Sequence, residues 1–365
     1  TKAAAADALA ESGKCGTDAS YTFDAETGLL TISGTGKISD KMFLGNESIK
    51  SVIIKEGITS VGNSVFEGCT NLTSAIVPNS VSEIGYSMFY QCKNLTSVVL
   101  PDKISVIGEG MFEECFSLTD VTLPEGLTSI GRSFFFRCKK LEKINIPESV
   151  TKIDETAFYE CTNLSDIIIP DAVTSIGKSA FSGCKSLTNI TISANVTSIG
   201  AYGFSGCSGL SQITVDENNT VYDSRENCNA IIETAANKLL FGCKNTVIPN
   251  GITTIGQDAF SNCSGLTSII IPNSVTYIDM YAFYGCSGLK ELTMPCSTNF
   301  YKYPGTFDKI NLKKVTLTKG SGTMLDYRLD NGGNGLISCT NTPWYISRNS
   351  IEEIIPVSYT HLTLP

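Results

Sequence analysis

A 23-residue repeat constrains this chain more than any other feature. The repeat recurs seven times in succession between Ser51 and Ser211, as "DIIIPDAVTSIGKSAFSGCKSLT" (166–188) illustrates, and it returns at "SIIIPNSVTYIDMYAFYGCSGLK" (268–290). A fixed period of about 20 to 30 residues indicates a solenoid, in which each repeat forms one coil packed on its neighbours. Because a solenoid grows by adding coils, the length of 365 residues does not predict separate globular domains.

Charge and hydropathy narrow the classes of partner. The net charge is −9 and only 17% of residues are charged, which argues against a nucleic-acid-binding surface and against a polybasic membrane anchor. No run of 18 apolar residues is present, so no membrane span and no membrane insertion are expected. The first residues, "TKAAAADALAESG", lack the basic-then-apolar order of a signal peptide.

The repeat predicts the local structure of a coil when Ser51 is counted as position 1. Positions 2 and 4 are apolar and position 3 points the other way, as in a strand that proline ends at position 5. The "VTSI" stretch at positions 8–11 predicts a second extended piece. Glycine at position 12 predicts a corner with positive φ, and positions 13–19 predict a single helical or 3₁₀ turn.

Phenylalanine at position 16, cysteine at position 19 and leucine at position 22 are expected to fill the coil interior. Free cysteine packs as a small hydrophobe, so a column of buried thiols is expected rather than a metal site, for which the chain has no C-x2-C pair. The position-19 cysteines are Cys69, Cys92, Cys115, Cys138, Cys161, Cys184, Cys207, Cys263 and Cys286.

The repeat also resembles a known family. Leu164, Ile167 and Ile169 match L-x-x-L-x-L, and "P-x-x-V-x-x-I-G-x-x-A-F-x-x-C-x-x-L" follows, which is similar to the BspA-type leucine-rich repeats over about residues 15–317. The resemblance implies an α/β repeat solenoid, a right-handed superhelix with a parallel sheet on one face and short strands and single helical turns elsewhere. It further implies a secreted or cell-surface protein, as in host-associated bacteria and some parasitic protozoa, that adheres to a host extracellular-matrix or microbial surface protein or glycan.

One coil is longer than the others. The coil that begins at Gln212 carries ten additional residues, and "NAIIETAANKLLFGC" predicts a β-hairpin insertion at about 216–244. A two-residue loop at Ala235–Ala236 would place Cys228 opposite Cys243. A disulfide between these two cysteines and two free thiols both remain open.

The ends of the chain depart from the repeat. Residues 1–50 are expected to form an N-terminal tail and a β-hairpin cap around "YTFDAETGLLTISG". The solenoid is assigned to 51–317 and a glycine-rich linker to 318–356, where "NSIEEII" repeats the pattern of "ESIKSVI" and indicates the start of a second repeat segment. Residues 357–365 match nothing before them and are interpreted as a non-native tail.

No catalytic constellation is visible in the sequence. The single histidine, His361, lies in that tail, and no nucleotide-binding or nucleophile-elbow motif is present. Carboxylates fall at varying repeat positions, as solvated surface charges do. No enzyme, cofactor or metal is therefore expected.

A binding surface is the stronger expectation. Positions 1 and 3 form an apolar strand face with charged residues in its middle coils, and the candidate ligand-binding residues there are Asp120, Lys143, Asn145, Asp166 and Ile168. A second candidate surface holds the position-17 aromatics Tyr90, Phe136, Tyr159 and Tyr284, with Phe134 nearby. We consider a non-enzymatic adhesion protein first, a passive spacer or targeting module of a larger surface protein second, and a carbohydrate-active enzyme third.

Overall fold

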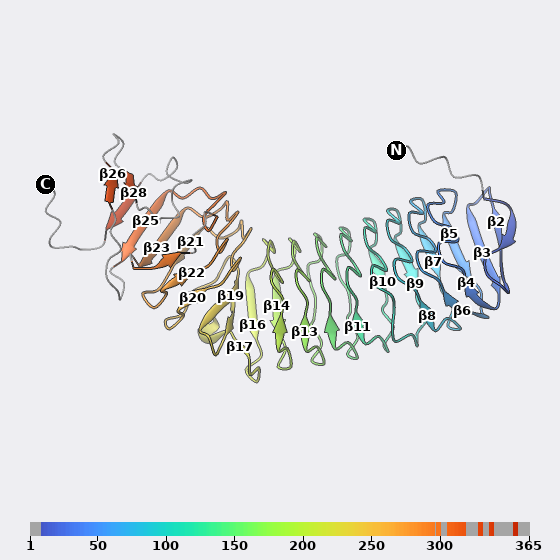
Figure 1. Ribbon diagram of the computed structural model, residues 1–365, viewed down its shortest axis with the longest axis horizontal. Coiled ribbons are helices and arrows are strands. Elements are labelled where there is room, and N and C mark those ends of the chain that lie inside the picture. Colours follow the sequence, from blue (N-terminus) through green and yellow to red (C-terminus); the bar gives the residue numbers. More distant parts are fainter. Residues whose placement is uncertain are drawn as a thin grey trace. The chain divides into compact units, whose positions relative to one another are not determined.

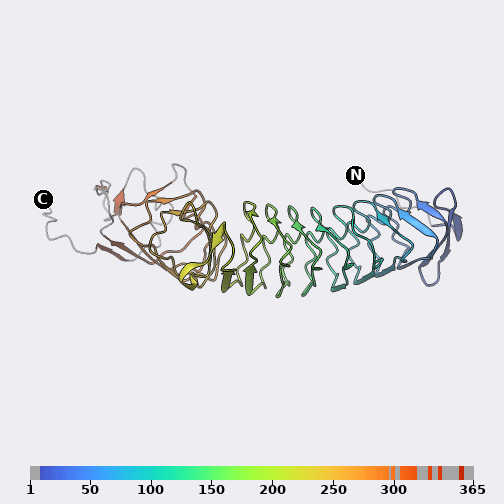
Figure 2. The same cartoon turned by 90° about the horizontal axis from the view of Figure 1, so that it is seen from below.

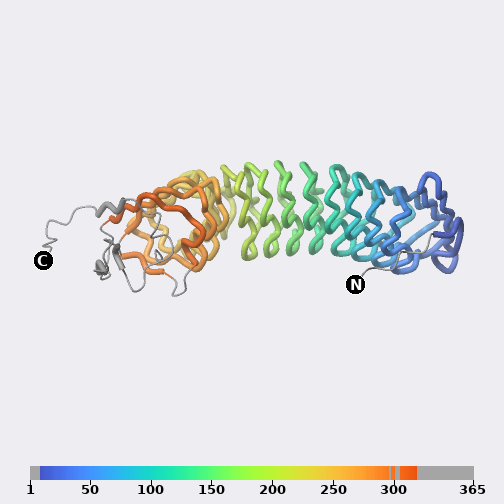
Figure 3. Tube along the Cα trace, turned by 90° about the horizontal axis from the view of Figure 1, so that it is seen from above, coloured from blue at the N-terminus to red at the C-terminus, as the bar shows by residue number. Residues whose placement is uncertain are grey.

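The computed structural model describes residues 9–295, 297–300, 305–318, 328–330, 336–338 and 353–356 (Figure 1). Two compact units divide the chain. Unit 1 comprises Thr1–Leu187 and Asn195–Phe204, and unit 2 comprises Thr188–Ala194 and Ser205–Pro365. Within unit 1 the Cα trace follows one coil after another from blue to green, as the repeat predicts (Figure 3).

The first sheet of unit 1 begins with antiparallel strands and continues with parallel ones. β1 (Ser12–Lys14), β2 (Ala19–Asp24) and β3 (Leu29–Gly34) are antiparallel, and Gly28 takes a φ of +75° in the turn between the last two. β3 then pairs in parallel with the solenoid strands, which keep a register of one repeat, as in Ser51↔Ser74 and Ser74↔Ser97. These strands are β5 (Ser51–Ile54), β7 (Ser74–Ile76), β9 (Ser97–Val99) and β10 (Asp120–Val121).

A second column of short parallel strands occupies another side of the coils in unit 1 (Figure 2). Its strands are β4 (Gly36–Ile38), β6 (Ile58–Val61), β8 (Glu83–Ile84), β11 (Ser129–Ile130), β12 (Lys152–Ile153), β13 (Ser175–Ile176) and β15 (Ser198–Ile199). The predicted extended piece at positions 8–11 is therefore present. Threonines at position 9 reinforce it, because Thr151 and Thr174 each donate a hydroxyl to the equivalent carbonyl of the preceding coil.

The helical part of the α/β prediction is wrong. In the part of the chain that the structure describes, the one helical element is the 3₁₀ turn η1 (Arg225–Asn227), and positions 13–19 form turns instead. Two residues of each such turn are left-handed, as Ser64 (φ 55°) and Gly68 (φ 72°) show. Backbone N–H groups of the turn donate to the next coil, for example Phe43 N to Val65 O at 3.0 Å. A seven-residue segment nucleates a helix poorly, and hydrogen bonds between coils satisfy its backbone instead.

The role predicted for glycine at position 12 is also wrong. These glycines have no positive φ, and at each of them except Gly131 an atom of the neighbouring coil lies less than 3 Å from where a Cβ would be. A Cβ at Gly62 would lie 2.4 Å from Asp40 Oδ1, and one at Gly177 would lie 2.4 Å from Glu155 N. Close stacking, rather than a special backbone angle, therefore explains glycine here.

Stacked phenylalanine rings fill the interior of unit 1. From Phe43 to Phe204 one ring per coil stacks on the next, with centroids 5.2 to 5.9 Å apart and interplanar angles of 3° to 20°. Phe158 is fully buried between Phe135 and Phe181. Leucines at position 22 are buried beside the rings, as predicted.

The cysteine column lies next to the rings and has a hydrogen-bonding role that the sequence does not show. Each thiol from Cys69 to Cys184 donates to the carbonyl of the phenylalanine in the preceding coil, at 3.1 to 3.2 Å. The position-19 cysteines are buried and free, as predicted. Burial raises the pKa of the Cys69 thiol to about 12, so the thiol stays protonated at neutral pH.

Unit 2 repeats the same plan. β14 (Asn189–Ile192) and β16 (Gln212–Val215) form a two-stranded parallel sheet. A four-stranded parallel sheet has the order β21 (Ser268–Ile270), β23 (Glu291–Pro295), β25 (Lys314–Thr318) and β28 (Glu353–Pro356). A six-stranded sheet has the order β17 (Tyr222–Asp223), β18 (Ala230–Glu233), β19 (Lys238–Gly242), β20 (Thr254–Ile255), β22 (Tyr277–Ile278) and β24 (Asn299–Phe300). β26 (Arg328–Asp330) and β27 (Leu336–Ser338) form an antiparallel pair. Phe260, Phe283 and Phe307 continue the stacked interior.

The hairpin insertion is present, but its register differs from the prediction. β18 and β19 pair as Glu233↔Lys238 near the turn, and the register then shifts between Ile231 and Ile232. Beyond this bulge the Cys243 thiol lies against Asn229 O at 3.4 Å. Cys228 and Cys243 are both free and buried in this structure, and a bridge between them stays a prediction.

β28 lies inside 318–356, where the sequence predicts a linker and the start of a second repeat segment. It pairs in parallel with β25, with Lys314 opposite Glu353, and so belongs to the same sheet. The tail 357–365 and His361 lie outside the described residues.

Candidate functional site

Side chains at positions 1 and 3 of unit 1 form one solvent-facing surface, which we call the sheet face. Strand alternation buries the position-2 side chains Val98 and Val121 and directs the side chains at position 3 toward solvent. Ile76, Val99 and Ile168 are 45%, 57% and 72% exposed, respectively. Large aliphatic side chains this exposed, repeated along one surface, are typical of a contact site.

Charged and polar residues interrupt the aliphatic side chains in the middle coils. All five predicted ligand-binding residues are exposed and occupy three consecutive coils: Asp120, Lys143, Asn145, Asp166 and Ile168. A single β-bridge joins Lys143 to Asp166. Among the ion pairs of the described residues, none involves Lys143, Asp120 or Asp166, so these charges are available to a partner.

Strand pairing on the sheet face changes in these coils. The parallel ladder ends at Val121, and from there to Asp166 the described pairing of unit 1 on this face is the Lys143↔Asp166 bridge. The position 8–11 strands remain paired over the same coils. The coils therefore stay stacked on one side while the sheet face loses its regular ladder.

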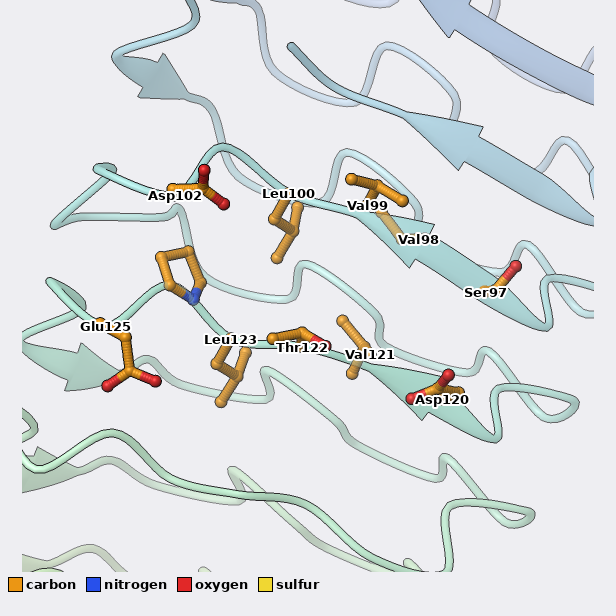
Figure 4. Close-up of a pocket in the computed structure, with 11 residues that line it drawn as sticks. Ser97, Val98, Val99, Leu100, Asp102, Asp120, Val121, Thr122, Leu123 and Glu125 are labelled. Atoms are coloured by element: carbon orange, nitrogen blue, oxygen red, sulfur yellow. The ribbon is translucent and has the colours of Figure 1, made fainter. Parts of the chain in front are cut away.

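An inter-coil pocket opens where the ladder ends. It encloses about 360 Å³ between the coil that carries β9 and the coil that carries β10 (Figure 4). Its lining residues are Ser97, Val98, Val99, Leu100, Asp102, Asp120, Val121, Thr122, Leu123, Pro124 and Glu125. Figure 4 shows Asp102 and Glu125 at one end of these two chain segments and Asp120 near the other, with aliphatic side chains between.

A neighbouring asparagine positions one of the pocket's carboxylates. Asn79 donates its side-chain N–H to Asp102 Oδ2 at 3.0 Å, and its own oxygen accepts the Asp102 N–H at 2.8 Å. Asn79 donates to Oδ2 alone, so Asp102 Oδ1 can still accept a hydrogen bond from a partner. In this part of the described structure neither Asp102 nor Glu125 forms an ion pair.

The second predicted surface is packed rather than open. Phe136 stacks on Tyr159 with centroids 4.9 Å apart, and the Arg137 guanidinium lies 5.2 Å above Phe136. Tyr90 is half-buried, and Phe134 is completely buried against Phe112 and Phe135. In unit 2, Tyr284 is covered by the Lys309 ammonium at 4.8 Å.

Sequence reasoning missed a hydrogen-bonded chain at position 18. Gln91 donates to Glu114, and Arg137 bridges Glu114 at 3.2 Å and Glu160 at 3.0 Å. Burial, together with the nearby Glu114 charge, raises the pKa of the adjacent Glu113 carboxyl. The alternation of glutamate and arginine at one repeat position was the signal in the sequence. We call this surface, formed by the position-17 and position-18 residues, the turn flank.

No group of three His, Cys, Asp or Glu side chains among the described residues is arranged to hold a metal ion. No helix in this part of the chain is long and apolar enough to cross a membrane.

Comparison with known proteins relates the fold to a family. A family model described as "BspA type Leucine rich repeat region" matches in six copies over residues 36–165, 132–236 and 230–334. A leucine-rich cell surface protein from Faecalibacterium prausnitzii A2-165 is 23% identical, with a TM-score of 0.56 and 94% of each chain covered. A leucine-rich repeat protein from Bacteroides ovatus ATCC 8483 is 25% identical with a TM-score of 0.48, covering 82% of this chain and 93% of its own. No curated protein matches the chain.

The matched ranges extend over most of the sequence, from residue 36 to residue 334. The chain therefore belongs to the BspA-type leucine-rich repeat family.

Proposed function

We propose that this protein is a non-enzymatic cell-surface or secreted adhesin that binds a host or microbial macromolecule through the sheet face of unit 1. The observation that carries the proposal is the exposure of Ile76, Val99 and Ile168 on one surface, interrupted by the unpaired charges Asp120 and Lys143. An apolar patch with a polar rim is the arrangement that protein interfaces use. The surface location is supported by the Faecalibacterium cell surface protein, which has the same fold.

The sheet face is favoured over the turn flank because its groups are unsatisfied. On the flank, Arg137 is already bound to two glutamates, and Phe136 is in contact with Tyr159 and the Arg137 guanidinium. A partner there would have to break existing contacts before it gained new ones. On the sheet face, Ile168 and Lys143 have no such contacts to lose.

The test combines ligand identification with surface variants. Purified protein is applied to arrays of matrix proteins and glycans, and the affinity of any ligand found is measured for Lys143→Glu/Ile168→Asp. Binding should fall at least tenfold, or about 1.4 kcal/mol, because central interface residues carry most of the binding energy. Arg137→Ala/Tyr159→Ala on the turn flank is the matched control and should leave affinity unchanged.

Other outcomes would favour the alternative functions. Loss of binding in the flank variant alone would place the site on the turn flank. Silence on every array would favour a passive spacer or targeting module. Release of products from a glycan would favour a carbohydrate-active enzyme. Circular dichroism of each variant shows whether the fold is retained.

A further inference from the structure

We infer that the inter-coil pocket receives a lysine or arginine side chain from a protein partner. The inference rests on the proposed function, because the pocket opens on the sheet face, and it names the chemistry that the partner presents there. A cavity of about 360 Å³ is at the small end of the range for ligand sites and suits one long side chain rather than a folded element.

Charge complementarity identifies the occupant. Asp102, Asp120 and Glu125 line the pocket, and no lysine or arginine is among its lining residues. A neutral or acidic side chain entering the pocket would leave these carboxylates without a counter-charge in a partly closed space. A cationic side chain would pair with them, and the pairing gains strength as water is displaced.

The apolar part of the pocket excludes a small inorganic cation as the preferred occupant. Leu100, Leu123 and Val99 supply aliphatic walls between the acidic ends, whereas a hard cation prefers several converging oxygen ligands. Lysine and arginine side chains have a long aliphatic stem and a charged head, which match the walls and the acidic end in turn. Asp102 and Glu125 occupy equivalent positions of adjacent coils and lie at the same end of the pocket (Figure 4).

Pre-organisation adds to the selectivity for a cation. The two hydrogen bonds with Asn79 hold Asp102 before a partner arrives, so less side-chain entropy is lost on binding. A guanidinium presents two parallel N–H donors, which makes arginine the better of the two candidate occupants.

The experiment uses a short extended peptide as the probe, so that it does not depend on identifying the natural partner. A fluorescein-labelled Gly-Ser-Val-Arg-Val-Ser-Gly amide is titrated with the full chain and followed by fluorescence anisotropy. The same peptide with citrulline in place of arginine is isosteric and neutral. Arginine peptide should bind at least about tenfold more tightly than citrulline peptide, as loss of a charge-assisted pair implies.

Two variants place the peptide in the pocket. Asp102→Asn/Glu125→Gln removes the charges at one end, and Thr122→Phe fills the opening while keeping every charge. Each should reduce affinity for the arginine peptide about tenfold or more. The matched control, Glu148→Gln/Asp171→Asn, removes two charges at the same repeat position in the next two coils, outside the pocket, and should change affinity less than twofold.

Equal binding of the arginine and citrulline peptides, or equal losses in the pocket and control variants, would overturn the inference. No binding of the arginine peptide by the native protein would also overturn it. These results would leave the proposed function standing, because a macromolecule can bind Ile168 and Lys143 without entering the pocket. Conversely, if Lys143→Glu/Ile168→Asp has no effect on a macromolecular ligand, the adhesin proposal fails at the sheet face whatever the peptide does.

Discussion

Replacing Phe158 by alanine should destabilise unit 1 strongly and locally. The ring is fully buried and stacks on Phe135 at 5.4 Å and on Phe181 at 5.2 Å. Removing a buried phenylalanine side chain leaves a cavity and costs about 3–5 kcal/mol. Each stacked pair contributes about 0.5–1.5 kcal/mol beyond burial, so Phe158→Leu, which keeps most of the volume and loses both pairs, should cost about 1–3 kcal/mol.

The location of the destabilised residues in Phe158→Ala distinguishes a stacked solenoid from a single globular core. Coils of a solenoid contact mainly their neighbours, so hydrogen exchange should rise most in residues 120–188. Urea unfolding gives the change in stability, and exchange measured by mass spectrometry gives its location. Ile168 is exposed in the adjacent coil, so the control Ile168→Ala should change the free energy of unfolding by less than about 0.5 kcal/mol. A uniform loss of protection along unit 1 in Phe158→Ala would refute the reasoning.

The remaining predictions concern the thiols and the turn flank. Cys161→Ser should cost only about 1 kcal/mol, because the Phe135 carbonyl that accepts the thiol at 3.1 Å remains an acceptor for a hydroxyl; a cost above about 3 kcal/mol in urea unfolding would contradict this. The free energy of unfolding should fall as pH rises above about 8.5, because thiols of the unfolded chain ionise there while folded Cys69, with a pKa of about 12, keeps its proton. A urea midpoint that stays constant from pH 8 to 10 would contradict the buried column. Arg137→Ala should lower the free energy of unfolding by about 1 kcal/mol, because it leaves two glutamates without their ion pair. Arg132→Ala, whose partner carboxylate is 3.9 Å away, should lower it by less than about 0.5 kcal/mol. Equal costs would show that the hydrogen-bonded chain at position 18 does not contribute to stability.

Periodicity in the sequence predicts the interior of the coils well. Position in the repeat decides burial for Phe158 and Cys161, and alternation along the strand decides the exposure of Ile168. These are properties of one coil and its identical neighbours, so one-dimensional spacing is sufficient to infer them.

Features that depend on the contact between coils were not predictable in the same way. Glycine at position 12 fits either a positive φ or a close approach, and only the 2.4 Å clearance at Gly62 distinguishes the two. The left-handed backbone falls on residues such as Ser64 and Arg137, which carry no conformational signal in the sequence. The pocket is likewise a property of two coils together: it lies between β9 and β10, whose pairing stops at Val98 and Val121, although the residues that follow keep the pattern of the other coils.

Hydroxyl-radical footprinting of the protein bound to its array-identified ligand tests the central claim most directly, because the exposed side chains report which surface is covered. Ile76, Val99 and Ile168 report on the sheet face, while Phe136 and Tyr159 report on the turn flank. Oxidation of the three aliphatic reporters should fall on binding, while oxidation of the two aromatic reporters should be unchanged. Protection of Phe136 and Tyr159 with unchanged oxidation of Val99 and Ile168 would contradict it.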